Sequence, residues 1–404
     1  LTSDIEGIAR PVSHWVRTST SAATVGKDAA EAVQAAMVTP GQIASLILPS
    51  DTAWDEGGVT HAALEPATPA LFVTDMLAQA AEALDGPESL LLLGGTALTE
   101  SNLEMAGRIA AETGCELLSE WSNARLERGA GRVAIGRVPY PIDIALEVLK
   151  PYKRIVLLGA RAPIGFFAYP GKPAILTREG ADILMLASAG TDLTAALTAL
   201  GEATSATQTL PAYVAKAEVP DRQHGPINLD ALAAVIARTI PEDAIIVDES
   251  VTTGRAFSPV TKGAAKHTWL NNCGGSIGYG LPVAVGAAVA CPDRKVMVLT
   301  GDGSAMYTIQ ALWSMARENL DVTILIFANR SYQILRGELT NVGAQNPGPR
   351  AIDMLSLDRP DLQWVHMANS MGVDGCRVND CETLELAIET GLATRSPYLI
   401  QIDL

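Results

Sequence analysis

Two oxygen-bearing side chains, Asp302 and Asn329, follow apolar runs of the chain at positions where they could bind a metal ion. Asp302 stands between two glycines directly after the run Lys295–Thr300, and Asn329 follows the run Val322–Ala328. Their separation of 27 positions suits a strand–helix–strand crossover, which brings both strand ends to one edge of a parallel sheet. The carboxylate and the amide oxygen would then form a hard oxygen site, suited to Mg²⁺ that bridges a diphosphate.

The residues around Asp302 favour a bound phosphate group. Gly301 and Gly303 let backbone N–H groups approach a phosphate, and a helix that begins near Ser304 favours the anion at its N-terminus. Ligands of open α/β sheets bind beyond the carboxyl ends of the strands. A dinucleotide fingerprint would need glycine at position 306, where this chain has Met306.

Two further segments could contribute to the same site. A glycine-rich stretch, Gly274–Pro282, precedes a helix of small apolar residues, and by itself it equally indicates a flexible loop before a tightly packed helix. The segment Asp248–Gly254 follows a strand, and the hydroxyl of Thr252 could reach a diphosphate. A cluster of helix N-cap residues is an equal alternative for that segment.

The sequence Gly301-Asp302-Gly303, with Asn329 at this spacing, is similar to the signature of thiamine-diphosphate (ThDP)-dependent enzymes. The resemblance implies that the side chains of Asp302 and Asn329 bind magnesium and that the Ser331 carbonyl completes the protein ligands. It further implies cofactor contacts from eight residues: Thr252, Gly275, Ser276, Ile277, Gly301, Gly303, Ser304 and Tyr332. Among these, Ile277 would be the apolar wedge that bends the cofactor, and the Gly275 carbonyl would accept a hydrogen bond from the aminopyrimidine.

One departure from the family signature indicates the subgroup. The family usually shows two asparagines, and the first is Ala328 here, which leaves the metal position intact. The sequence Arg330-Ser331-Tyr332 resembles an acetolactate synthase large subunit-like subgroup.

The resemblance implies an enzyme that decarboxylates a 2-oxo acid with ThDP and Mg²⁺. Capture by a second 2-oxo acid would give an acetohydroxy acid, as in acetolactate synthase, and capture by a proton would release an aldehyde, as in benzoylformate decarboxylase. The sequence does not decide between these outcomes, because acceptor choice depends on a few pocket contacts. A non-catalytic cofactor-binding or regulatory family member is an alternative of another class.

The elements that must position these residues indicate an α/β fold with parallel-sheet, three-layer domains. A strand–helix rhythm predicts a central Rossmann-like domain over 65–205 and a diphosphate-binding domain with the ThDP fold over 206–404. Residues 1–60 resemble only the end of the family's pyrimidine-binding domain. Its activating glutamate is therefore expected upstream of this chain, because Glu6 and Glu31 do not match a strand-to-helix turn. We accordingly expect these 404 residues alone to be inactive.

Composition and short motifs limit which binding partners, cell compartment and further cofactors are expected. The formal net charge of −16 argues against a nucleic-acid surface and gives no indication of a membrane partner. The five cysteines include no Cys-x-x-Cys pair, which favours a reducing cytoplasm over a disulfide framework or a zinc site. The turns at Gly94 and Gly159 lack the Gly-Met-His-Gly stretch of flavin-dependent relatives, so FAD is not expected. The family resemblance implies a homodimer or homotetramer.

Overall fold

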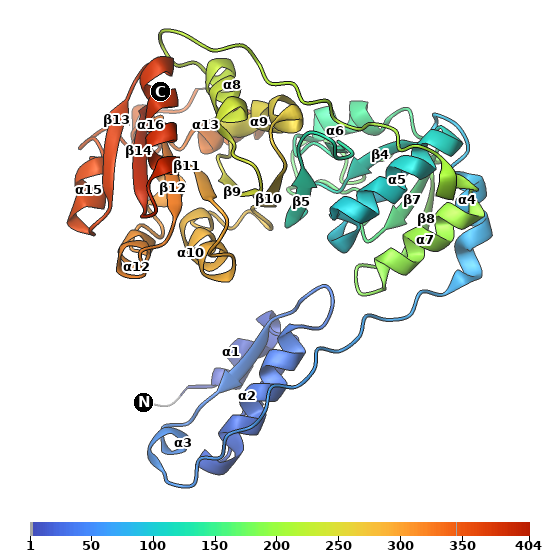
Figure 1. Ribbon diagram of the computed structural model, residues 1–404, viewed down its shortest axis with the longest axis horizontal. Helices are drawn as coiled ribbons and strands as arrows, with labels where there is room; N and C mark the ends of the chain where they lie inside the picture. Colours follow the sequence, from blue (N-terminus) through green and yellow to red (C-terminus); the bar gives the residue numbers. More distant parts are fainter. Residues whose placement is uncertain (1–2, 345) are drawn as a thin grey trace.

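The computed structural model describes residues 3–344 and 346–404, which form three α/β units along the chain (Figure 1). Each unit contains one sheet, with two, five and seven strands in chain order, and nearly all strand pairs are parallel. The predicted α/β class with parallel sheets is therefore confirmed. No helix among the described residues is long and apolar enough to cross a membrane.

The N-terminal unit is small and is joined to the rest by a long extended segment (Figure 1). Strands β1 (Trp15–Thr18) and β2 (Ala44–Ile47) pair in parallel through the crossover helix α2 (Ala22–Ala36). Two short helices flank them, α1 (Ile5–Ala9) and α3 (Asp51–Trp54). The alanine-rich sequence predicts a helix from Asp28, whereas α2 begins six residues earlier, directly after Ser21. Alanine is the best helix former, and the pair Ala22 and Ala23 forms the first turn of α2.

The central unit is a five-stranded parallel sheet in the order β6-β4-β3-β7-β8. Its middle strand β3 (Ser89–Leu93) is fully buried, and alternate leucines enter hydrophobic clusters on opposite faces of the sheet. This is the pattern of a strand covered on both faces by helices. The other elements are α4 (Leu77–Ala83), α5 (Glu100–Thr113), β4 (Glu116–Ser119), β6 (Gly136–Arg137), α6 (Ile142–Leu149), β7 (Arg154–Leu158), β8 (Asp182–Ala187) and α7 (Leu193–Ala203).

The C-terminal unit is a seven-stranded sheet in the order β13-β14-β12-β11-β9-β10-β5, with hydrophobic clusters on both faces. Its strands are β5 (Arg125–Arg128), β9 (Ala244–Glu249), β10 (His267–Asn271), β11 (Val296–Gly301), β12 (Val322–Ala328), β13 (Asp374–Val378) and β14 (Tyr398–Asp403). Its helices are α8 (Leu229–Thr239), α9 (Phe257–Val260), α10 (Gly280–Ala290), α11 (Asp302–Ala305), α12 (Ala311–Arg317), α13 (Gln333–Asn341), α14 (Pro349–Met354), α15 (Trp364–Ser370) and α16 (Cys381–Ala393).

Strand β5 links the two larger units. It lies within the range predicted for the central domain, yet it pairs antiparallel with β10 at the edge of the C-terminal sheet. Neither strand is an apolar run, since β5 reads Arg-Leu-Glu-Arg and β10 begins with His-Thr. Sequence periodicity therefore gives no signal for the pairing that joins the units. The predicted domain boundaries stay predictions.

Candidate active site

The structure places Asp302 at the carboxyl end of β11, beside the end of β12. Gly301 is in register with Phe327 on the neighbouring parallel strand, so the two chain segments leave the sheet together. The Asp302 side chain is only 2% exposed. Its Oδ1 accepts a hydrogen bond from the Gly303 backbone N–H at 2.8 Å, and its Oδ2 accepts one from the Arg330 N–H at 2.7 Å. Asp302 thus ties together the two turns that follow β11 and β12.

The turn after β12 is held in a specific conformation. Arg330 has φ +55°, a left-handed backbone that non-glycine residues rarely adopt. Its side chain compensates with ion pairs to Asp361 at 2.8 Å and Asp403 at 3.1 Å. Asn329 Oδ1 accepts the Ser331 N–H at 2.9 Å, so the amide oxygen lies over the turn. The ion pairs fix the peptide that donates to Asp302.

The chemistry of this donor set fits a divalent cation. Burial raises the pKa of the Asp302 carboxyl to about 6, and within residues 3–344 and 346–404 no Lys or Arg side chain makes an ion pair with it. A buried carboxylate is costly unless it is paired or coordinates a metal. The carboxylate of Asp302 and the amide oxygen of Asn329 are the hard ligands that Mg²⁺ takes.

The predicted phosphate-binding turn is partly covered. A Cβ atom on Gly303 would lie 2.7 Å from the Tyr332 ring, so glycine is needed there for the ring to pack against the turn. A Cβ on Gly301 would meet nothing within 4 Å, which leaves that side of the turn open. Ser304 is buried within α11, which begins at Asp302 rather than near Ser304 as the sequence predicts. The sequence also predicts a helix over Tyr307–Glu318, whereas α12 spans only Ala311–Arg317.

The glycine-rich loop before α10 leaves Ile277 unpacked. Gly274, Gly275 and Gly278 have φ values of +67°, +68° and +89°, which explains why glycine is needed at these positions. The Ile277 side chain is 43% exposed, and its N–H donates to the Gly275 carbonyl at 3.0 Å. The Ser276 hydroxyl donates to the Cys273 carbonyl at 2.9 Å. Within the loop, then, the Gly275 carbonyl and the Ser276 hydroxyl already have local partners.

Sequence reasoning missed the residue that anchors this loop, Glu249. Its side chain is buried at the end of β9 and accepts hydrogen bonds from the N–H groups of Tyr279 and Gly280, both at 2.9 Å. The Thr300 hydroxyl donates to it at 3.2 Å. Burial raises its pKa above the ordinary value, while these donors act in the opposite direction. A carboxylate at the N-terminus of α10 also matches the helix dipole.

The segment that contains Thr252 leaves the same edge of the sheet. Thr252 is half-buried and precedes the short 3₁₀ turn Thr253–Ala256, which its side chain does not cap. Asp248 accepts from the Trp269 indole N–H at 3.1 Å, so adjacent Asp248 and Glu249 face different neighbours. The Thr252 hydroxyl is therefore not used by the turn, whereas Asp248 Oδ1 accepts a hydrogen bond from the Ser250 N–H at 2.9 Å, so both interpretations of the segment stay predictions.

Aromatic residues of the central unit lie over the glycine-rich loop. The Phe166 ring is 3.6 Å from the point that a Gly275 Cβ would occupy. Its centroid is 4.8 Å from that of Trp121 and 6.1 Å from that of Tyr140, and the latter two are 5.3 Å apart. These three rings, here called the aromatic cluster, form a wall from another unit beside the candidate site.

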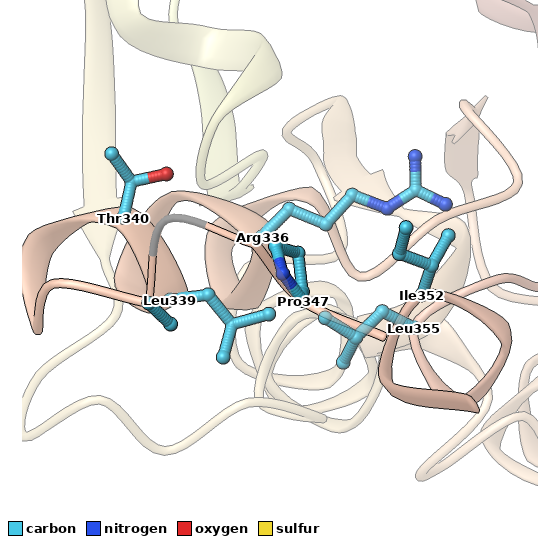
Figure 2. A pocket seen from close by; sticks show the side chains of 7 residues that line it. Arg336, Leu339, Thr340, Pro347, Ile352 and Leu355 are labelled. Atoms are coloured by element: carbon cyan, nitrogen blue, oxygen red, sulfur yellow. The ribbon is translucent and has the colours of Figure 1, made fainter. Parts of the chain in front are cut away.

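A cavity of about 470 Å³ adjoins the turn that carries Ser331. Figure 2 shows that Leu339 on α13 and Ile352 on α14 line it together with Leu355. The Leu355 carbonyl accepts hydrogen bonds from the Tyr332 N–H at 3.0 Å and the Ser331 hydroxyl at 3.2 Å. The turn predicted to bind the metal and an apolar hollow are thus part of one local structure.

The two early glutamates are engaged within the N-terminal unit. Glu6 forms an ion pair with Arg10 at 2.5 Å and accepts a hydrogen bond from the Thr18 hydroxyl, which lowers its pKa. Glu31 forms an ion pair with Arg17. Their contacts give neither glutamate a place beside the glycine-rich loop.

Comparisons with known proteins agree with this geometry. Residues 253–402 match the family model described as thiamine pyrophosphate enzyme, C-terminal TPP binding domain. The chain is 44% identical over 403 residues to "Putative acetolactate synthase large subunit IlvX" of Mycobacterium tuberculosis, covering 100% of this chain and 77% of that protein. It is 29% identical over 426 residues to benzoylformate decarboxylase of Pseudomonas aeruginosa, covering 99% of this chain and 77% of that protein.

A solved structure shares the fold. The ThDP-dependent 4-hydroxybenzoylformate decarboxylase of Rhodococcus jostii RHA1 superposes with a TM-score of 0.80 at 23% identity, covering 99% of this chain and 77% of that one. Together with the identity to IlvX, these matches show that the chain belongs to the thiamine-diphosphate-dependent enzymes, in the group that resembles acetolactate synthase large subunits.

Proposed function

We propose that this protein decarboxylates a 2-oxo acid with ThDP and Mg²⁺. The observation that carries the proposal is the buried Asp302 carboxylate, held at the sheet edge by the N–H groups of Gly303 and Arg330. Asp302, Asn329 and the Ser331 carbonyl would hold the magnesium ion. The cofactor's diphosphate would then be contacted by Gly301, Gly303, Ser304 and Thr252.

The remaining residues would position the reacting end of the cofactor. ThDP, when bound, supplies an electron sink that lets the carboxylate of a 2-oxo acid leave as CO₂. The half-exposed Ile277 would support the cofactor ring from below, with Gly275 and Ser276 beside it and Tyr332 against the phosphate turn. Glu249 would keep this loop in place through the peptides at the start of α10.

The product is proposed by analogy with the relatives. The name of the relative IlvX supports carboligation to an acetohydroxy acid. The aromatic cluster favours a second candidate, the release of an aldehyde from an aryl 2-oxo acid, because flat rings pack well against an aryl group. Benzoylformate decarboxylase is also the name of a relative that matches nearly the whole chain.

We extend the proposal to the cell compartment and to the binding partners of the protein. All five cysteines are free thiols, which supports a reducing cytoplasm. We propose that the protein forms homodimers or homotetramers and binds neither nucleic acid nor membrane. The absence of FAD stays a prediction.

Product analysis tests the proposed function. Purified protein is incubated with ThDP, Mg²⁺ and either pyruvate or benzoylformate, and CO₂, aldehyde and acetohydroxy acid are measured. CO₂ release that is lost in Asp302→Asn supports decarboxylation at this site, and the organic product then separates ligase from decarboxylase. ThDP binding without CO₂ release from any 2-oxo acid, by a protein that also carries the expected activating glutamate, would instead indicate a non-catalytic member of the family.

A further inference from the structure

A second cavity, of about 950 Å³, lies between the central and C-terminal units. Its walls come from residues within 126–140, from residues 213–220 of the connecting segment, and from residues within 255–263 around α9. None of the predicted cofactor or metal residues lines it. Tyr140 of the aromatic cluster does line it, so the cavity adjoins the candidate active site without including Asp302.

The lining of this cavity is rich in positive charge. Five basic side chains line it, namely Arg128, Arg137, Lys216, Arg255 and Lys262. Only two carboxylates do so, those of Glu127 and Glu218. In the described part of the chain, none of these five basic groups makes an ion pair, whereas Glu127 is already paired with Arg125 at 2.6 Å. Since the whole chain carries a net charge of −16, this surplus of cations is a local feature of the cavity.

Arg128 is the buried member of the set. It is only 9% exposed, one of its Nη atoms donates to the Ser258 carbonyl, and its guanidinium lies 5.2 Å from the centre of the Trp269 ring. Burial and the nearby positive charge of Arg137 lower its pKa to about 10. A buried guanidinium without a carboxylate partner is costly. The neighbouring arginine adds repulsion, so an anion between the two would stabilise both.

The other four basic groups are exposed and come from different segments. Arg137 belongs to the central unit, Lys216 to the connecting segment, and Arg255 and Lys262 to the C-terminal unit. Arg137 donates only to a neutral acceptor, the Asn271 amide oxygen, at 3.2 Å. Arginine binds phosphate oxygens in pairs of parallel hydrogen bonds, and lysine adds a point charge.

We propose that this cavity, here called the interunit anion site, binds a small organic molecule that carries two or more phosphate charges. The phosphate groups would lie between Arg128 and Arg137, and the lysines would contact their outer oxygens. The bound molecule would contact all three segments and thereby link the central unit to the C-terminal unit. The site is separate from the one at which the cofactor's diphosphate is expected.

The test uses inorganic tripolyphosphate as the probe, with calorimetric titration in EDTA so that no metal supports binding at Asp302. We expect equal affinity for the unmodified protein and Asp302→Asn. The double variant Lys216→Gln/Lys262→Gln, which changes two exposed side chains, should weaken binding roughly tenfold or more. Arg128→Gln should weaken it further, and thermal unfolding checks that this variant is folded.

The matched control removes two exposed basic residues outside the cavity, Arg178→Gln/Arg350→Gln, and should bind the probe as the unmodified protein does. Three results would overturn the proposal. They are no measurable binding at millimolar probe, equal binding by the Lys216/Lys262 double variant and the control, and binding that is lost only in Asp302→Asn.

Discussion

Asp302 and Glu249 are two buried carboxylates at one sheet edge, and their partners assign them different roles. Asp302 accepts one hydrogen bond on each carboxylate oxygen, from the backbone N–H groups of two turns that follow neighbouring strands. Each oxygen therefore keeps a lone pair that could bind a cation. Glu249 accepts from two peptides and a hydroxyl, so its oxygens are largely used in holding the loop. The first is suited to bind a ligand, and the second to position the groups that bind it.

Glu249→Gln should loosen the glycine-rich loop. The amide would present an NH₂ group to N–H donors and leave one of them without an acceptor, at a cost of about 1–3 kcal/mol. We expect weaker ThDP binding and a lower melting temperature, measured by titration and calorimetry. Glu389→Gln on the exposed face of α16 is the matched control and should change neither. Unchanged ThDP affinity in Glu249→Gln would contradict its positioning role.

Ile277→Ala should affect catalysis more than folding. The side chain is 43% exposed, so truncation should cost only about 1–1.5 kcal/mol of the free energy of unfolding, less than at a fully buried site. The same truncation would remove the wedge under the cofactor ring, and kcat should fall. Steady-state turnover and urea unfolding are measured together. A loss of stability with unchanged kcat would show that Ile277 is a packing residue.

At the scale of elements, strand β10 places a histidine in the core. His267 is fully buried, its Nδ1 lies 2.7 Å from the Ala265 carbonyl, and its Nε2 has no partner among the described residues. Burial lowers its pKa from 6.5 to about 4, and the charges of Arg128 and Arg132 act in the same direction. The imidazole is therefore neutral in the folded protein at neutral pH.

This histidine should make the fold sensitive to acid. Between pH 6.5 and 4 the unfolded chain binds a proton that the folded chain does not, so stability present above pH 6.5 is lost as the pH falls. The loss due to this group should be about 2 kcal/mol between pH 7 and pH 5. Urea unfolding at the two pH values should show this loss reduced in His267→Gln. The control variant His366→Gln changes an exposed residue and should show the full loss of stability. An equal loss in both variants would mean that a group other than His267 causes the acid sensitivity.

The buried parallel strands could be predicted from the sequence, because they are continuous apolar runs with turn residues at their ends. β3, β7, β9, β11 and β12 are of this kind, and the strand ends at Asp302 and Asn329 follow from them. Other strands could not be predicted in this way, because they carry polar residues and lie at or near sheet edges. They are β1, β5, β10 and β13. Glu249 was missed for a related reason, since its partners are backbone groups of a loop that only the fold brings close.

At the scale of the whole molecule, the N-terminal unit exposes much apolar surface. Trp54 is 73% exposed, and Ile8, Val12 and Ile43 are also exposed. Several large apolar side chains left exposed in one small unit are typical of a surface that contacts another protein. This surface supports the proposed homodimer or homotetramer.

Sedimentation velocity at micromolar concentration should therefore show a dimer or tetramer. Trp54→Glu places a charge on the exposed surface and should shift the distribution toward the monomer. The neighbouring charge-neutralising change Asp55→Asn is the control and should leave it unchanged. A protein that sediments as a monomer at all concentrations would contradict the predicted assembly.

The central claim is that Asp302, Asn329 and Ser331 hold the metal that binds the cofactor's diphosphate. The most direct measurement is a crystal structure grown with millimolar ThDP and Mn²⁺, in which anomalous scattering locates the metal. We predict one strong peak within coordination distance of a carboxylate oxygen of Asp302, Asn329 Oδ1 and the Ser331 carbonyl, with diphosphate density beside it. Diphosphate density beside these residues without a metal peak, or a metal peak away from Asp302, would contradict it.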